Sequence, residues 1–94
     1  MFEWDPAKAA ANAVKHGVSF EEAATVFADG DALDGPAIRH FSGEPRLFRL
    51  GRSAFDRVLF VAYTLRRHDD GETVRIISAR KASRKERAAY ARGD

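Results

Sequence analysis

An apolar run near the middle of the chain, Arg57 to Leu65 (RVLFVAYTL), constrains the fold more than any other segment. Nearly every residue in it is apolar, which is typical of a central strand covered on both faces. The chain has only 94 residues, so its core is small and folding hides about 60–65% of the unfolded surface. We therefore expect one domain over residues 1–94, with its core centred on this strand.

Strand-like segments on either side of this run predict an antiparallel sheet. Arg46 to Arg52 precedes it across the turn-like sequence SAFD, and Thr73 to Ala79 returns after the hairpin sequence HDDG. Ala37 to Phe41 is expected to form an edge strand, because the glycine and proline before it are incompatible with a continuous helix. Four consecutive strands joined by short connections predict an antiparallel meander.

Helix signals dominate the first 30 residues. Phe2 to Trp4 predicts a short strand, and Asp5 followed by proline is typical of an N-cap and first helical position. This helix is expected to end at Gly17, because glycine adopts the left-handed C-terminal conformation most easily. A second helix is expected to start at Ser19, with Glu22 completing a capping box.

A final helix is predicted to follow the last strand. Its N-cap is Ser83, and Glu86 occupies the reciprocal position of a second capping box. The order is therefore a short strand, two helices, a meander of about four strands and a C-terminal helix. This order predicts an α+β fold with the helices gathered on one side of the sheet.

Several classes of protein are excluded by composition. The chain has no cysteine, so it forms neither disulfides nor thiolate zinc sites. Its three histidines, His16, His40 and His68, form no HxH or HExxH motif, and we expect no metal site and no cofactor. Residues 1–20 lack the apolar core of a signal peptide, and the longest apolar run is too short to span a bilayer. We expect a cytoplasmic protein without a membrane partner.

Charge is distributed unevenly along the chain. Residues 1–45 carry three lysines or arginines against eight acids, a net charge of −5. Residues 46–94 carry thirteen against six, a net charge of +7. A basic half of this kind favours an anionic partner, and we interpret that partner as RNA. The alternative is that charges distant in sequence mix in the folded molecule.

The strongest candidate site lies where the last strand leads into the basic helix. Arg80 and Lys81 are the leading catalytic candidates, because the strand end fixes their direction; a solubilising junction is the alternative. Arg84 and Arg87 are candidates for binding phosphate, or they face water. Arg46 is a candidate for binding RNA, in a base and phosphate clamp with Glu44, although a cross-strand charge pair is the preferred interpretation. At the ends of the central strands, Arg52 is a candidate for binding RNA and Arg66 for catalysis, with surface solvation as the alternative. For the aromatic residues Trp4 and Tyr90, packing is preferred to base stacking.

The chemistry that suits these residues is RNA cleavage without a metal ion. The 2′-OH of RNA can attack the adjacent phosphate while the protein positions the chain, moves protons and stabilises the developing charge. Arginine suits the last task, because its planar fork donates two parallel hydrogen bonds to phosphate. His16 is the candidate proton-transfer residue, since an ordinary imidazole titrates near neutrality. Alternatively it caps the C-terminal end of its helix.

Three blocks of the sequence together resemble the BrnT family, the toxin half of a bacterial type II toxin–antitoxin pair. They are FEWDPAKAAANAVKHGVSFEEAATVF, EPRLFRLGRS and RIISARKASRKERAAY, and they cover nearly the whole chain in the family's order. The resemblance implies a RelE-like fold and a ribonuclease activity that arrests translation. It also implies a hetero-oligomer with a BrnA-type antitoxin, which reaches operator DNA through its own DNA-binding domain. The loop HDDGE is longer than is usual in the family.

Two functions of different classes remain open at this point. In the first, the protein is a metal-independent endoribonuclease. In the second, it is a binding module whose basic surface holds an acidic protein segment or nucleic acid without cutting it. Both kinds of binding weaken with salt, so turnover of excess RNA is the property that separates them.

Overall fold

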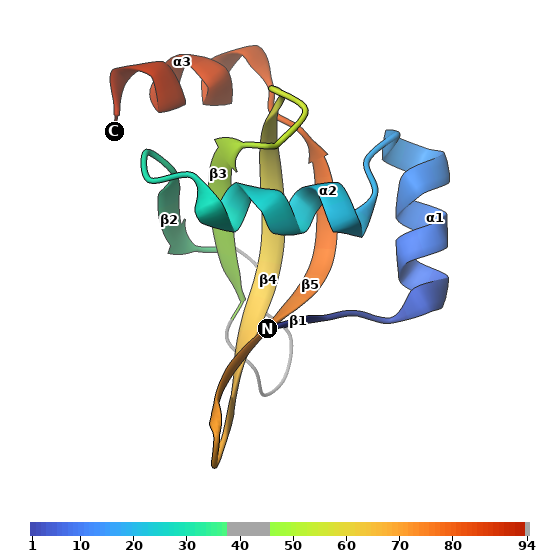
Figure 1. The fold of residues 1–94 in the computed structure, drawn as a ribbon. Coiled ribbons are helices and arrows are strands. Elements are labelled where there is room, and N and C mark those ends of the chain that lie inside the picture. The colour runs from blue at the N-terminus through green and yellow to red at the C-terminus, as the bar shows by residue number, and fades with distance from the viewer. Residues whose placement is uncertain (38–45, 94) are drawn as a thin grey trace.

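The structure of this protein, a computed structural model, describes residues 1–37 and 46–93. Within these residues the chain forms one five-stranded sheet and three α-helices, with a short 3-10 turn after the second helix (Figure 1). The elements in chain order are β1 (Phe2–Glu3), α1 (Pro6–His16), α2 (Phe20–Thr25), η1 (Val26–Ala28), β2 (Leu33–Pro36), β3 (Leu47–Arg52), β4 (Val58–His68), β5 (Gly71–Lys81) and α3 (Arg84–Arg92). The predicted α+β class is confirmed. None of the helices in the described ranges is both long enough and apolar enough to cross a membrane.

The sheet confirms the predicted antiparallel meander. Strands β2, β3, β4 and β5 are antiparallel neighbours in that order, and β1 pairs in parallel with the far side of β5. The apolar run predicted as the central strand is β4, which lies between β3 and β5. The short N-terminal strand was also predicted correctly.

The edge strand differs from the prediction. It is β2, Leu33–Pro36, whereas the expected strand Ala37–Phe41 lies outside the described residues except for Ala37, which is not in a strand. The backbone N–H of Ala37 donates to the carbonyl of Arg46 at 2.9 Å, so the nitrogen of the preceding Pro36 faces the free edge. Proline is tolerated at such a position because no ladder hydrogen bond is lost there.

The helix ends follow the sequence signals with one exception. Asp5 Oδ1 accepts a hydrogen bond from the N–H of Ala7 at 2.8 Å, and Gly17 ends α1 with φ of 68°. Both halves of the capping box at the start of α3 are present. In α2, Ser19 Oγ accepts from the N–H of Glu22 at 3.0 Å, but the Glu22 carboxylate bonds elsewhere. The reciprocal half of that capping box was therefore predicted wrongly.

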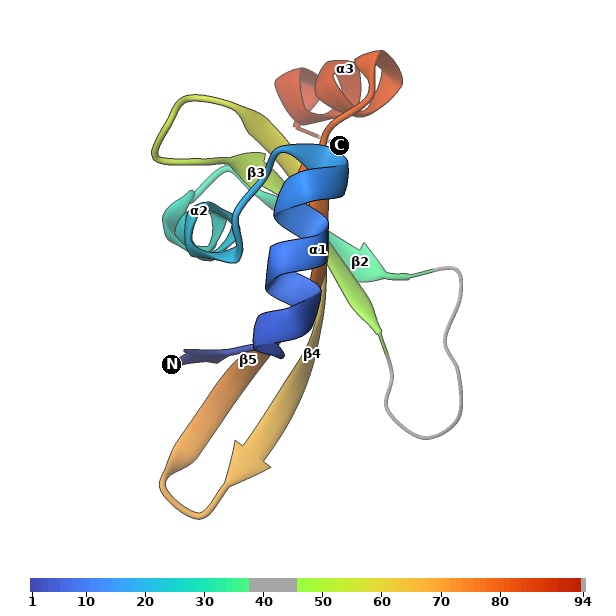
Figure 2. The same cartoon turned by 90° about the vertical axis from the view of Figure 1, so that its right-hand side faces the viewer.

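Helices α1 and α2 cover one face of the sheet, and the core lies between them and the central strands (Figures 1 and 2). Trp4 packs against this core with its ring centroid 5.9 Å from that of Phe20, so its preferred assignment to the core is confirmed. The core consists of Val18, Phe20, Ala23, Val26, Leu59, Val61, Ile76 and Ala79.

The two ends of the sheet differ in how they are covered. Helix α3 lies across the end at which β3 and β5 finish, rather than beside α1 and α2, so the expectation that all helices gather on one side holds only for two of them (Figure 2). At the opposite end, β4 and β5 continue as a two-stranded ribbon beyond the rest of the sheet (Figure 1). We call these the α3 end and the hairpin end.

Candidate functional site

A cationic pocket of about 430 Å³ lies at the α3 end of the sheet. Its walls come from the β3–β4 turn, the start of β4, the end of β5 and one side of α3. Four basic side chains and one acidic side chain line it. The lining residues are Arg52, Asp56, Arg57, Val58, Lys81, Ala82, Arg87, Tyr90 and Ala91. This convergence of cations at a single concavity matches the expectation for an anion-binding site.

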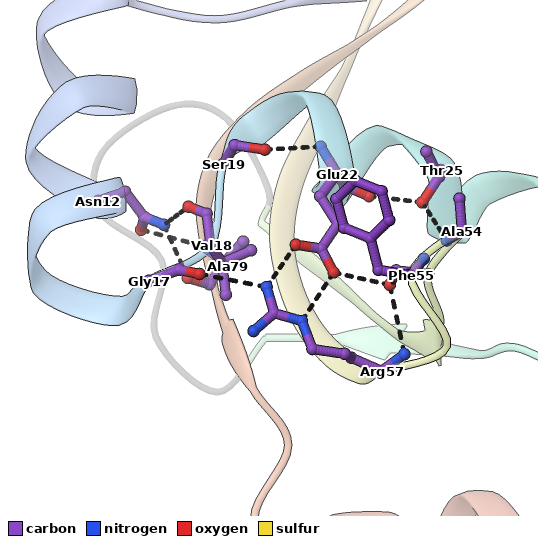
Figure 3. Close-up of polar contacts among 11 residues, drawn as sticks. Asn12, Gly17, Val18, Ser19, Glu22, Thr25, Ala54, Phe55, Arg57 and Ala79 are labelled. Carbon is purple, nitrogen blue, oxygen red and sulfur yellow. Dashed lines mark hydrogen bonds and ion pairs between the residues drawn. The ribbon is translucent and has the colours of Figure 1, made fainter.

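One wall of the cationic pocket is fixed by a buried ion pair (Figure 3). Arg57 donates to both carboxylate oxygens of Glu22, with Nε 2.9 Å from Oε2, and its Nη2 also donates to the carbonyl of Gly17 at 3.1 Å. Ser53 Oγ donates to the same carboxylate at 2.7 Å. The hydrogen bond from Arg57 is the main reason that the pKa of Glu22 lies below its ordinary value of 4.5, despite burial. Arg57 is thus a structural cation whose charge is largely balanced.

Arg52 and Tyr90, which also line the pocket, are both held by Asp29. Tyr90 Oη donates to Asp29 Oδ2 at 2.7 Å, and the backbone N–H of Arg52 donates to the same oxygen at 2.8 Å. The hydrogen bond to Asp29 raises the pKa of Tyr90, so the phenol is neutral at pH 7. The Arg52 guanidinium lies 5.5 Å from the Tyr90 ring centroid and 3.0 Å from Asp56 Oδ1. Tyr90 therefore anchors α3 to the sheet while one side of it faces the pocket.

Lys81 and Arg87 are cations of the pocket whose charge is not balanced by the contacts described above. Lys81 is exposed and forms no ion pair within residues 1–37 and 46–93. Arg87 donates through Nη1 to the carbonyl of Ala82 at 2.8 Å, which fixes its position without neutralising its charge. A carbonyl is a dipole rather than a counter-ion, so both side chains retain a full charge for an anionic ligand.

Arg80 is not part of the cationic pocket. In β5 it pairs with Phe60, whereas Lys81 pairs with Leu59, so the two neighbours point to opposite faces of the sheet. Arg80 forms a bidentate ion pair with Glu86, at 2.7 and 2.9 Å, and its guanidinium lies 4.4 Å from the Phe60 ring centroid. The structure thus separates the two residues that the sequence placed together as leading candidates.

The remaining predicted residues are divided between the two ends. Arg52 and Arg87 lie in the cationic pocket. Arg66 pairs with Thr73 in the outer part of the β4–β5 ribbon, and Arg46 lies at the start of β3, so both are toward the hairpin end. Arg66 Nε lies 3.9 Å from a carboxylate oxygen of Glu3. Glu44, the expected partner of Arg46, lies outside the described residues.

His16 and Arg84 are at the α3 end but do not line the pocket. His16 is half-buried at the C-terminal end of α1, and the carbonyl of the next residue, Gly17, accepts the hydrogen bond from Arg57. Arg84 is the exposed first residue of α3. The sequence interpretation overlooked Arg57 as a pocket residue, because its partner Glu22 is 35 residues away and no local pattern marks the pair.

Comparisons with known proteins agree with the α+β fold. The family model described as "Ribonuclease toxin, BrnT, of type II toxin-antitoxin system" matches residues 4–86. The chain therefore belongs to the BrnT family, whose members are ribonuclease toxins paired with an antitoxin protein.

A solved structure shows the same fold. The crystal structure of the Brucella abortus ribonuclease toxin BrnT, determined at 1.1 Å resolution, superposes with a TM-score of 0.67. The two chains are 24% identical, and the match covers 89% of this chain and 99% of the Brucella one. A search of curated protein sequences found no significant match.

Proposed function

We propose that this protein cuts RNA in the cationic pocket without a metal ion, and that the cleavage arrests translation. The observation that carries the proposal is the convergence of Arg52, Lys81 and Arg87 on one concavity at the α3 end, with Lys81 forming no ion pair among the described residues. Family membership supports the ribonuclease class. The pocket supplies the chemistry that this class needs.

The proposed reaction uses the 2′-OH of the substrate as the nucleophile. The 2′-OH gives up its proton as its oxygen attacks the adjacent phosphorus, and the bond to the 5′-oxygen breaks. The leaving 5′-oxygen takes up a proton, so the products are a 2′,3′-cyclic phosphate and a 5′-OH. Negative charge develops on the non-bridging oxygens during this step, and Lys81 and Arg87 are placed to stabilise it. Arg52, held against Tyr90 and Asp56, is proposed to bind a neighbouring phosphate.

His16 is the proposed proton-transfer residue, although it does not line the pocket, so this role requires the substrate to extend from the pocket to the C-terminal end of α1. It is half-buried at the end of α1, one residue from a carbonyl that Arg57 binds, so the same network that builds the pocket fixes the end of its helix. A His16→Gln variant is expected to cleave more slowly while still binding RNA, because glutamine cannot transfer the proton. An unchanged rate in this variant would assign proton transfer to another group.

The decisive experiment measures cleavage of excess RNA in the presence of EDTA. Wild-type protein is expected to destroy many equivalents of RNA, whereas Lys81→Ala is expected to be about 100-fold slower, in the range seen for loss of one transition-state donor. Lys8→Ala is the matched control, because Lys8 is also an exposed lysine and lies on α1 outside the pocket. Wild-type cutting no faster than Lys81→Ala, or cutting that EDTA abolishes, contradicts the proposal.

A BrnA-type antitoxin is the proposed partner, and its acidic side chains are proposed to occupy the cationic pocket. Stoichiometric antitoxin is then expected to stop cleavage, and Lys81→Ala is expected to weaken the complex. If Lys81→Ala leaves antitoxin affinity unchanged, neutralisation acts through another surface. If the protein protects RNA stoichiometrically and never turns it over, the binding-module interpretation is correct.

A further inference from the structure

Phe55 is a large apolar side chain held in solvent beside the cationic pocket. It lies in the turn between β3 and β4, and 71% of its surface is exposed. The next two residues along the chain, Asp56 and Arg57, both line the pocket. Phe55 itself does not line the pocket, but it belongs to the turn that forms one of its walls, and it is not among the core residues.

The turn that carries Phe55 is firmly held. The N–H of Phe55 donates to Ser53 Oγ at 3.1 Å, and this hydroxyl in turn donates to the buried carboxylate of Glu22 (Figure 3). The N–H of Ala54 donates to Thr25 Oγ1 at 2.9 Å. Asp56 adopts a left-handed backbone with φ of 65° and donates its N–H to the carbonyl of Ser53 at 2.9 Å.

These contacts hold the backbone of the turn that carries the ring. The buried ion pair and two side-chain caps hold the backbone on both sides of Phe55, yet the ring itself has no packing partner in the core. Proteins bind unpaired bases with exposed aromatic rings carried near cationic grooves, because every base has a π-face. An exposed ring on a firmly held turn that also lines the cationic pocket fits this arrangement. Phenylalanine has no hydrogen-bonding group, so this contact is tolerant of base identity.

We propose that Phe55 stacks on an unpaired base of single-stranded RNA next to the phosphate bound in the cationic pocket. This inference rests on the proposed function, since it assigns the substrate class and a positioning residue to the same site. Bases in a duplex are already stacked on both sides, so double-stranded RNA cannot use this contact without unstacking. The protein is therefore expected to bind and cut single-stranded RNA in preference to a duplex.

The test measures the affinity for a fluorescent single-stranded decamer carrying 2′-O-methyl groups, which block cleavage. Phe55→Ala and Phe55→Leu are expected to bind about 5- to 100-fold more weakly than wild type, the range for losing one base–aromatic stack. Phe55→Trp is expected to bind at least as well as wild type. Because the ring is exposed, thermal unfolding should be unchanged in all three, which separates lost stacking from lost folding.

The outcomes separate this inference from the proposal on which it depends. Equal affinity across the Phe55 series, with affinity still lost in Lys81→Ala, overturns the stacking role alone. Affinity that is the same in wild type and Lys81→Ala, or no detectable binding by wild type, overturns both. Unchanged RNA affinity together with weaker antitoxin binding in Phe55→Ala overturns the stacking role and assigns the ring to a protein interface.

Discussion

The two ends of the β4–β5 strand pair both carry arginines but differ in what is packed beside them. At the α3 end, Lys81 and its neighbours lie against the β3–β4 turn and α3, and basic side chains converge on one pocket. At the hairpin end, residues 65–72 are exposed, and Arg66 and Arg67 lie near carboxylates of Glu3 and Glu72. The difference indicates that arginines form a site only where supporting elements bring them together and nearby carboxylates do not balance them.

The largest expected effect compares an ion pair from each end. Arg57→Ala should lower the free energy of unfolding by about 3 kcal/mol, because it leaves the Glu22 carboxylate, only 3% exposed, without its cation. Arg67→Ala removes one partner of an exposed pair, in which the arginine side chain is 87% exposed, and should change stability by less than about 0.5 kcal/mol. Urea denaturation measures both. Similar losses for the two variants would mean that the ends are equally well supported.

The next effect concerns activity. Arg87→Ala should slow RNA cleavage about tenfold, since it removes one charge-assisted contact from the cationic pocket. Arg67→Ala removes the same charge from the hairpin end and should leave the rate within about twofold, because it is far from the pocket and screened by solvent. Initial rates of cleavage of a labelled RNA by the two variants provide the measurement. An equal loss in both variants would point to overall charge instead of a localised site.

Acid should affect the α3 end selectively. The folded pKa of Glu22 is below its unfolded value of 4.5, so its contribution to stability is complete above that pH and is lost as the pH falls through the folded pKa. Glu22→Gln should therefore be less stable than wild type at pH 7 and approach it below pH 4.5. Denaturation midpoints between pH 3 and pH 7 provide the measurement. A constant gap between the two proteins would show that folding does not shift the pKa of Glu22.

The smallest effect lies at the boundary between the two ends. Thr64 is 3% exposed, whereas the next residue, Leu65, is 42% exposed. Within the described part of the chain, Thr64 Oγ1 is buried without a hydrogen-bond partner. Thr64→Val keeps the shape of the side chain and removes this cost, so it should stabilise the protein by up to about 1 kcal/mol. A destabilised variant would reveal a partner for the hydroxyl.

Local signals predicted much of the fold. The N-cap at Asp5, the left-handed Gly17 and the apolar strand β4 each depend on short-range chemistry, and the structure confirms all three. The α3 capping box was predicted for the same reason. Glu22 shows the limit of such signals, because its spacing from Ser19 indicates a local cap while Arg57 provides a stronger tertiary partner.

The candidate site was harder to predict than the fold. Successive side chains in a strand point to opposite faces, and this alternation alone separates Arg80 from Lys81. The ion pair of Arg80 with Glu86, and the position of Arg66 at the far end of β4, depend on how distant segments pack. Sequence pattern and composition do not reveal such contacts between distant segments.

The parallel pairing of β1 with β5 has a consequence for the order of assembly during synthesis. Phe2 and Glu3 find their partners only at Val74 and Arg75, and the side chain of Asn12 bonds to the backbone of Ala79. A ribosome must therefore release more than three quarters of this chain before its first residues have anything to pair with. The pocket at the α3 end is completed only after α3 has emerged, so a nascent chain is expected to be inactive until then.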